Sequence, residues 1–140
     1  MATFSDADVG HLDHQLLQNG PITSYFDRRI LAEDLRWLRE HRYHINTFDA
    51  GSWSSKDVAF DELAARLEFP DDFGRNLHAL NDCLSELPIP MDSGRVVVFE
   101  RFDQLSVRTP EWAWSFLDIC ASQSRRHLLF GKGLLCSAAE

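Results

Sequence analysis

Residues 95–100 read Arg-Val-Val-Val-Phe-Glu, and the four residues at their centre, 96–99, are all apolar. A strand that alternates apolar and polar residues has one face in water, whereas an unbroken apolar run is typical of a strand covered on both faces. Such strands occur in parallel sheets with helical crossovers. The stretch therefore predicts an α/β fold in which helices cover a parallel sheet.

The sequence on either side of this run predicts helices that alternate with strands. We expect helices over 24–42, 54–69, 76–87 and 109–120, and further strands over 43–48 and 127–130. Ser54 opens a capping-box pattern, Asn76 is a favoured N-cap residue, and Pro110 suits a first helical position. Trp112 and Trp114 diverge on a helix, which predicts one buried and one exposed ring. The result is a small three-stranded parallel sheet flanked by helices.

Length and composition predict one globular domain. The chain has 140 residues and a mass of 16.1 kDa, 44% of its residues are hydrophobic, and no apolar run approaches 18 residues. We therefore expect neither a disordered chain nor a membrane span. Residues 1–21 show no sustained periodicity and predict a loose or partly helical lead-in. We divide the chain into an N-terminal extension with one amphipathic helix, residues 1–42, and a domain over residues 43–140.

The negative charge is concentrated in the middle of the chain. The formal net charge is −8, and residues 43–92 contain 3 Lys and Arg against 10 Asp and Glu, a net charge of −7. Such a field repels phosphate backbones and anionic membrane surfaces. We therefore expect no direct nucleic-acid partner and no membrane partner.

The cysteines indicate an intracellular protein with reduced thiols. Cys83, Cys120 and Cys136 are odd in number and lack the spacing of a paired motif, and the N-terminus lacks the features of a signal peptide. Their apolar neighbours favour buried thiols over nucleophiles. His78 and Cys83 are five residues apart, which places them roughly 140° apart around a helix. They cannot form a catalytic dyad there, and no other catalytic set is evident, so we expect no enzyme activity.

Metal and cofactor motifs are weak or missing. Two His-x-x-His pairs, His11 with His14 and His41 with His44, have a spacing that could suit a metal, but no further ligand pattern completes either pair. The glycine-rich patterns that bind dinucleotides or phosphates are absent from the sequence. We expect no metal and no cofactor.

A polar stripe lies on the predicted helix over 76–87. Arg75, His78 and Asp82 follow one another at spacings of three and four residues, opposite the leucines, and Asp71 and Asp72 precede them. A compact acidic surface of this kind suits insertion into a cationic cleft. An ordinary solvated helix face is the alternative, and charge pattern alone favours that alternative.

The same segment resembles a known family. Residues 69–84 read FPDDFGRNLHALNDCL, which is similar to the LP-x-YYG-x-NLDALWDCL signature of the barstar family of intracellular ribonuclease inhibitors. The similarity extends more loosely over residues 43–132, and residues 1–42 lie outside it. The resemblance implies the layered barstar-like α/β fold. It also implies a cytoplasmic protein that occupies the active site of a basic, extracellular-type ribonuclease while that enzyme is still inside its producing cell.

The resemblance also implies roles for individual residues. Asp82 matches the acidic residue that the family inserts among the phosphate-binding cations of the enzyme. Phe73, Gly74 and Asn76 match residues that shape the loop, and Gly74 would supply backbone freedom. The full predicted binding surface consists of Asp71, Asp72, Phe73, Gly74, Arg75, Asn76, His78, Asn81 and Asp82.

Three positions depart from the signature of the family. His78 stands in place of an aspartate, Asn81 in place of a tryptophan and Asp72 in place of a tyrosine. Because tyrosine and tryptophan often anchor interfaces, these changes leave the partner open. It could be another basic ribonuclease, a different cationic toxin protein, or nothing that this chain still recognises. A second interpretation is a non-catalytic interaction module with a barstar-like fold whose partner is not a ribonuclease.

Overall fold

The computed structural model describes residues 12, 16, 20–90 and 92–140, and among them four parallel strands form one sheet in the order β1-β4-β3-β2. The strands are β1 (Ile22–Tyr25), β2 (His44–Asp49), β3 (Arg95–Glu100) and β4 (Leu134–Ala139). The helices are α2 (Arg28–Glu40), α3 (Lys56–Leu67), α4 (Leu77–Ser85), α5 (Phe102–Arg108) and α6 (Pro110–Leu129), and a 3-10 turn, η2 (Ala50–Ser52), follows β2.

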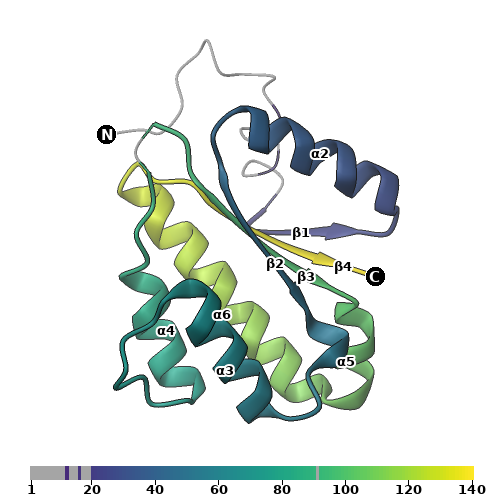
Figure 1. The fold of residues 1–140 in the computed structure, drawn as a ribbon, viewed down its shortest axis with the longest axis vertical. Helices are drawn as coiled ribbons and strands as arrows, with labels where there is room; N and C mark the ends of the chain where they lie inside the picture. Colours follow the sequence, from purple (N-terminus) through teal and green to yellow (C-terminus); the bar gives the residue numbers. More distant parts are fainter. Residues whose placement is uncertain (1–11, 13–15, 17–19, 91) are drawn as a thin grey trace.

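Strand β3 is covered on both faces, as its apolar run predicts. Val97 and Phe99 belong to the larger core, which is shared with helices α3 to α6, whereas Val96 and Val98 belong to a second core beneath α2. Figure 1 shows the resulting layers, with α2 on one side of the sheet and the other helices on the opposite side. The predicted α/β class with a flanked parallel sheet is correct.

The prediction of three strands is wrong, because β1 adds a fourth. Ile22 to Tyr25 pair with Cys136 to Ala139 of β4, and the helix predicted to begin at residue 24 begins only after Asp27, whose side chain accepts a hydrogen bond from Arg29 N at 2.8 Å. A four-residue strand is too short to show a clear period. The sheet therefore includes residues that precede position 42.

The predicted strand over residues 127–130 is also wrong. His127 to Leu129 form the last turn of α6, whose helix ends at Phe130, and the strand follows at β4. A short apolar run does not distinguish helix from strand, and the first conformational break comes at Gly131, whose φ is 77°. Helix α6 thus extends to 20 residues.

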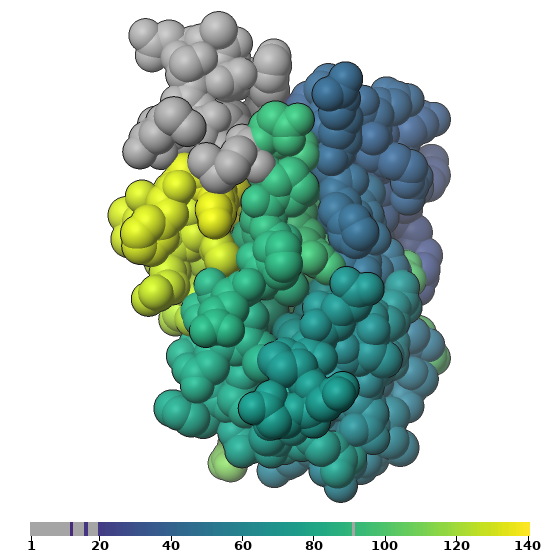
Figure 2. Space-filling model, turned by 60° about the vertical axis from the view of Figure 1, so that its left-hand side comes forward, coloured from purple at the N-terminus to yellow at the C-terminus, as the bar shows by residue number. Residues whose placement is uncertain are grey.

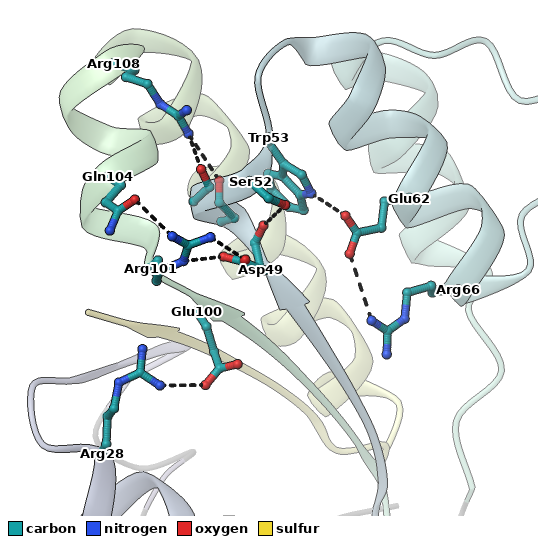
Figure 3. Close-up of polar contacts among 12 residues, drawn as sticks. Arg28, Asp49, Ser52, Trp53, Glu62, Arg66, Glu100, Arg101, Gln104 and Arg108 are labelled. Carbon is teal, nitrogen blue, oxygen red and sulfur yellow. Dashed lines mark hydrogen bonds and ion pairs between the residues drawn. The ribbon is translucent and has the colours of Figure 1, made fainter.

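Helix α3 begins one residue later than expected and is held in place by a tryptophan. Ser55, not Ser54, is the N-cap and accepts a hydrogen bond from Val58 N at 3.3 Å. Trp53 Nε1 donates to Glu62 Oε2 at 2.8 Å, and Arg66 Nη1 lies 3.9 Å from Glu62 Oε1. Figure 3 shows this chain of contacts beside the end of β2. It fixes α3 next to the sheet.

A second polar network holds α5, a helix that the sequence pattern did not predict. Arg101, with a φ of 52°, donates to both carboxylate oxygens of Asp49 and to Gln104. Arg108 Nη2 donates to the carbonyl of Gly51 at 2.9 Å. Figure 3 shows Arg101 between Asp49 and Gln104. A Cβ at Gly51 would lie 2.8 Å from the Arg101 Cβ, so only glycine fits this close approach.

The buried residues agree with two sequence predictions. Cys120 and Cys136 are buried, and Cys83 is half-buried. The thiols therefore pack largely as small apolar side chains. Trp112 is 8% exposed and Trp114 is 67% exposed, as their divergence on one helix predicts.

Candidate protein-binding surface

Helix α4 has a buried leucine face and an exposed polar face. Leu80 and Leu84 are buried in the large core, and Leu87 joins them just after the helix ends. The predicted polar stripe lies on the other side, where His78 and Asp82 are exposed. Figure 2 shows α4 and the adjoining residues of the chain as part of one continuous outer surface. The leucine face thus anchors the helix to the core, and the polar face is accessible from solvent.

The predicted N-cap of α4 is correct and organises the preceding loop. Asn76 Oδ1 accepts a hydrogen bond from Ala79 N at 2.8 Å, and its Nδ2 donates to the Gly74 carbonyl at 3.2 Å. The expectation of special backbone freedom at Gly74 is wrong. The left-handed conformation falls on Arg75, with a φ of 53°, and not on the glycine.

Arg75 is an intramolecular clamp. Its Nε and Nη2 lie 2.9 and 3.1 Å from the two carboxylate oxygens of Asp61, and Nη2 is 3.7 Å from Asp57. Both acidic residues belong to α3. A bidentate pair of this kind fixes orientation as well as distance. The pair connects the loop before α4 to α3. The guanidinium group of Arg75 is therefore engaged within the molecule.

Phe73 supports the loop from below. Its ring centroid lies 5.0 Å from that of Phe69 and 5.9 Å from that of Phe60, and the residue packs on the main core. Aromatic contacts at these distances add to the burial of apolar surface. Phe73 therefore shapes the surface and is only partly exposed.

The acidic residue within α4 is Asp82. Its side chain is 66% exposed, and Oδ2 lies 3.7 Å from Nε2 of His78, a side chain that is 89% exposed. Burial raises the pKa of the neighbouring Cys83 thiol, and the carboxylates of Glu86, Asp82 and Asp72 raise it further. Three negative groups from the loop and the helix therefore act on one point of the surface.

Asn81 points toward α6. Its Oδ1 accepts a hydrogen bond from Gln123 Nε2 at 2.8 Å. One turn further along, the ring of His127 lies 2.8 Å, through Nε2, from the Leu84 carbonyl. Both α6 side chains are buried. These two bonds fix the rotation of α4 about its axis, and with it the direction of the acidic face.

The predicted residues thus fall into two groups. Asp71, Asp72, His78 and Asp82 are exposed, and the last two lie next to each other. Phe73 and Asn81 are half-buried, and Gly74, Arg75 and Asn76 are exposed but hydrogen-bond to other residues of the molecule. Sequence reasoning missed Glu86, the exposed residue that ends α4. Its position four residues after Asp82, on the same side of the helix, was an available signal.

Two further patterns are relevant to the described residues, a cluster of metal-ligating side chains and a membrane-spanning helix. Over the described ranges, no three His, Cys, Asp or Glu side chains are grouped as they would be around a metal ion. The His41 ring stacks on Trp37, and His11 and His14 lie outside the described residues. None of the helices described for this chain has the length and apolarity needed to span a bilayer.

Comparisons with known proteins give a family match and a relative. The family described as Barstar (barnase inhibitor) matches residues 43–136, more than half of the chain. A Bacillus subtilis (strain 168) protein named "Putative ribonuclease inhibitor YrdF" is 41% identical over 46 residues, which are 31% of this chain and 50% of that relative. The match thus spans half the length of this relative.

Proposed function

The chain belongs to the barstar family, and from this premise we propose that it inhibits a basic ribonuclease by inserting the acidic face of α4 into the active site of that enzyme. In this proposal the protein performs no catalysis and protects the cytoplasm of the cell that makes the ribonuclease. The name of the Bacillus subtilis relative supports the same class of partner.

The proposal rests on the exposed Asp82 carboxylate, which lies on a helix whose opposite face is buried in the core. Asp82, Asp72 and Glu86 form a negative surface, and the contacts of α4 with the core and α6 hold it in one orientation. An enzyme that cleaves RNA must present cations to phosphate groups. A fixed set of carboxylates competes for those cations without offering a bond to cleave. Occlusion of the active site then stops turnover.

In this proposal, some of the predicted residues contact the enzyme and the others stabilise the shape of the surface. Asp71, Asp72, His78 and Asp82 touch the enzyme in this proposal, and Phe73, Gly74, Arg75, Asn76 and Asn81 hold the surface in shape. Because exposed charges are screened by salt, the association should slow and the complex should weaken as ionic strength rises. An inhibitor that bound mainly through apolar contacts would not show this dependence.

A specific observation favours a second candidate, an interaction module whose partner is not a ribonuclease. Asn81 and Asp72 replace aromatic residues of the signature, and Asn81 bonds to Gln123 within the molecule. The surface therefore lacks two groups that often anchor interfaces. A purified partner that binds through Asp82 but has no nuclease activity would favour this candidate.

Inhibition of RNA cleavage tests the main proposal. The full chain is titrated into basic ribonucleases from the same organism, alongside Asp82→Ala and the matched control Glu33→Ala. Glu33 is exposed on α2, on the opposite side of the sheet. We expect Asp82→Ala to weaken inhibition at least about tenfold, as for a central interface residue, and Glu33→Ala to leave it unchanged.

Two results would contradict the proposal. Folded wild-type protein that inhibits none of these enzymes would remove the ribonuclease as partner. Equal inhibition by wild type and Asp82→Ala would remove α4 as the contact surface. Circular dichroism of each variant separates a lost contact from a lost fold.

A further inference from the structure

A groove that takes no part in the proposed inhibition lies beside the ends of β1 and β4. It is formed by the end of β1 and the residue after it, by α5, by the first turns of α6, and by the end of β4 with the residue after it. Phe26, Trp114 and Leu117 provide apolar surface, and Asp103 and Glu140 provide carboxylates. None of the residues that line it belongs to the segment 69–86.

The groove exposes two large aromatic side chains. Phe26 is 76% exposed and Trp114 is 67% exposed, and both line the groove. Single exposed apolar residues are common, but several in one place mark an interaction site. Tryptophan in particular is enriched among the residues that dominate the energy of protein interfaces.

The volume and the charges of the groove indicate its occupant. The hollow measures about 190 Å³, which is less than the roughly 300–1,000 Å³ of sites for drug-sized ligands and cofactors. It has room for one large side chain. Among the described residues that line it, the charged ones are Asp103 and Glu140, both acidic. A segment that places an apolar side chain in the hollow gains further from a neighbouring lysine or arginine.

We propose that this groove is a second protein-docking site, which binds a basic segment of a partner through one apolar anchor residue on Trp114 and Phe26. Figure 1 shows α4 and α5 on opposite sides of α6, so the groove and the acidic face of α4 are separate surfaces. The groove does not depend on the proposed inhibition and can be tested without a ribonuclease.

Two short peptides of opposite charge provide the probes. The full chain, labelled with ¹⁵N, is titrated with the capped hexapeptide KKLFKK and with its counterpart EELFEE, and the indole N–H signal of Trp114 is followed. We expect a saturable shift with KKLFKK and little change with EELFEE. Trp114→Ala should weaken binding at least about fivefold, measured by calorimetry, because it removes the anchor contact.

Matched variants separate the groove from general surface effects. Leu129→Ala alters an apolar residue that is even more exposed, on the same helix but outside the groove, and it should leave the affinity for KKLFKK unchanged. Asp103→Asn should weaken binding, whereas Glu33→Gln on α2 should not. These variants change exposed groups, so circular dichroism should show an intact fold.

Three outcomes would overturn the inference. One is the absence of saturable binding of KKLFKK to folded wild-type protein. Another is equal binding of the two peptides, which would mean that the carboxylates take no part. The third is concentration-dependent dimerisation that Trp114→Ala abolishes in sedimentation analysis, because the occupant would then be a second copy of this chain.

Discussion

Helices α4 and α6 pack against each other, yet they use their polar residues in opposite ways. Helix α4 has nine residues and directs His78 and Asp82 into solvent. Helix α6 has 20 residues and buries Gln123, Ser124 and His127. The shorter helix thus leaves two polar side chains in solvent, and the longer one buries three of its polar side chains inside the molecule.

The buried polar groups of α6 connect the two helices to the sheet. Gln123 bonds to Asn81 and His127 to the Leu84 carbonyl, both on α4, while Ser124 Oγ donates to the Leu134 carbonyl at 2.7 Å. Buried hydrogen bonds of this kind are costly to break. Changes to the buried polar residues of α6 should therefore appear as lost stability, and changes on the outer face of α4 as lost binding.

The largest expected effect is in the interior of α6. Phe116 is fully buried, and its ring lies 4.9 Å from Phe99, 5.3 Å from Trp112 and 5.8 Å from Trp53, between centroids. Phe116→Ala should lower the free energy of unfolding by about 3–5 kcal/mol, because it leaves a cavity. Urea denaturation measures the loss. The exposed Trp114→Ala should change stability by less than about 0.5 kcal/mol, and similar losses for both would contradict the assigned packing.

A smaller effect is expected at the start of α4. Asn76→Ala removes the side-chain oxygen that accepts from Ala79 N and should cost about 1 kcal/mol of unfolding free energy. Asn76→Ser retains a capping oxygen and should recover most of that loss. If the serine variant is as unstable as the alanine variant in urea, the cap is not what holds this end of the helix.

The third test uses pH to examine the bond between the helices. Burial lowers the pKa of His127 below its usual 6.5, and the Leu84 hydrogen bond offsets only part of this shift. Below pH 6.5 the unfolded chain therefore takes up a proton that the folded imidazole binds more weakly, and stability falls. The urea midpoint should drop from pH 7.5 to 5.5 by more in wild type than in His127→Asn. Equal drops would show that His127 does not contribute.

A small effect on stability is expected at the clamp between α3 and the loop. Asp61→Asn removes the charge that faces Arg75 and should cost less than about 1 kcal/mol, because the pair is exposed. The loop should nevertheless be cleaved faster by thermolysin under native conditions. Glu33→Gln is the control, and an unchanged cleavage rate in Asp61→Asn would show that the clamp does not order the loop.

The sequence predicted the elements that have a strong local signal. The unbroken run 96–99 gave the buried strand and the α/β class, and the N-cap at Asn76 was placed correctly. It did not predict β1, which has four residues, or β4, whose Cys, Ser and Ala residues have little strand preference. Helix α5 was missed because its seven residues are held by tertiary contacts from Arg101 and Arg108.

For the candidate surface, the sequence indicated which residues lie together but not which of them are free. The intervals of three and four residues predicted that Arg75 and Asp82 lie on the same side of the helix. The partners of Arg75 and Asn81 lie on other helices, 14 residues away on α3 and 42 residues away on α6. Local spacing contains no information on such contacts. Exposure and intramolecular pairing therefore required the three-dimensional arrangement.

The position of β4 has a consequence for the growing chain. The last strand of the sequence occupies an interior place in the sheet, and its register joins Ile22 to Cys136. A protein is synthesised from its N-terminus. Strand β1 therefore cannot pair with its neighbour β4 until nearly all of the other described elements have been synthesised. Until then β3 keeps one open edge. Truncation before Leu134 would thus remove an interior strand and separate β1 from β3 and β2, instead of removing an edge strand.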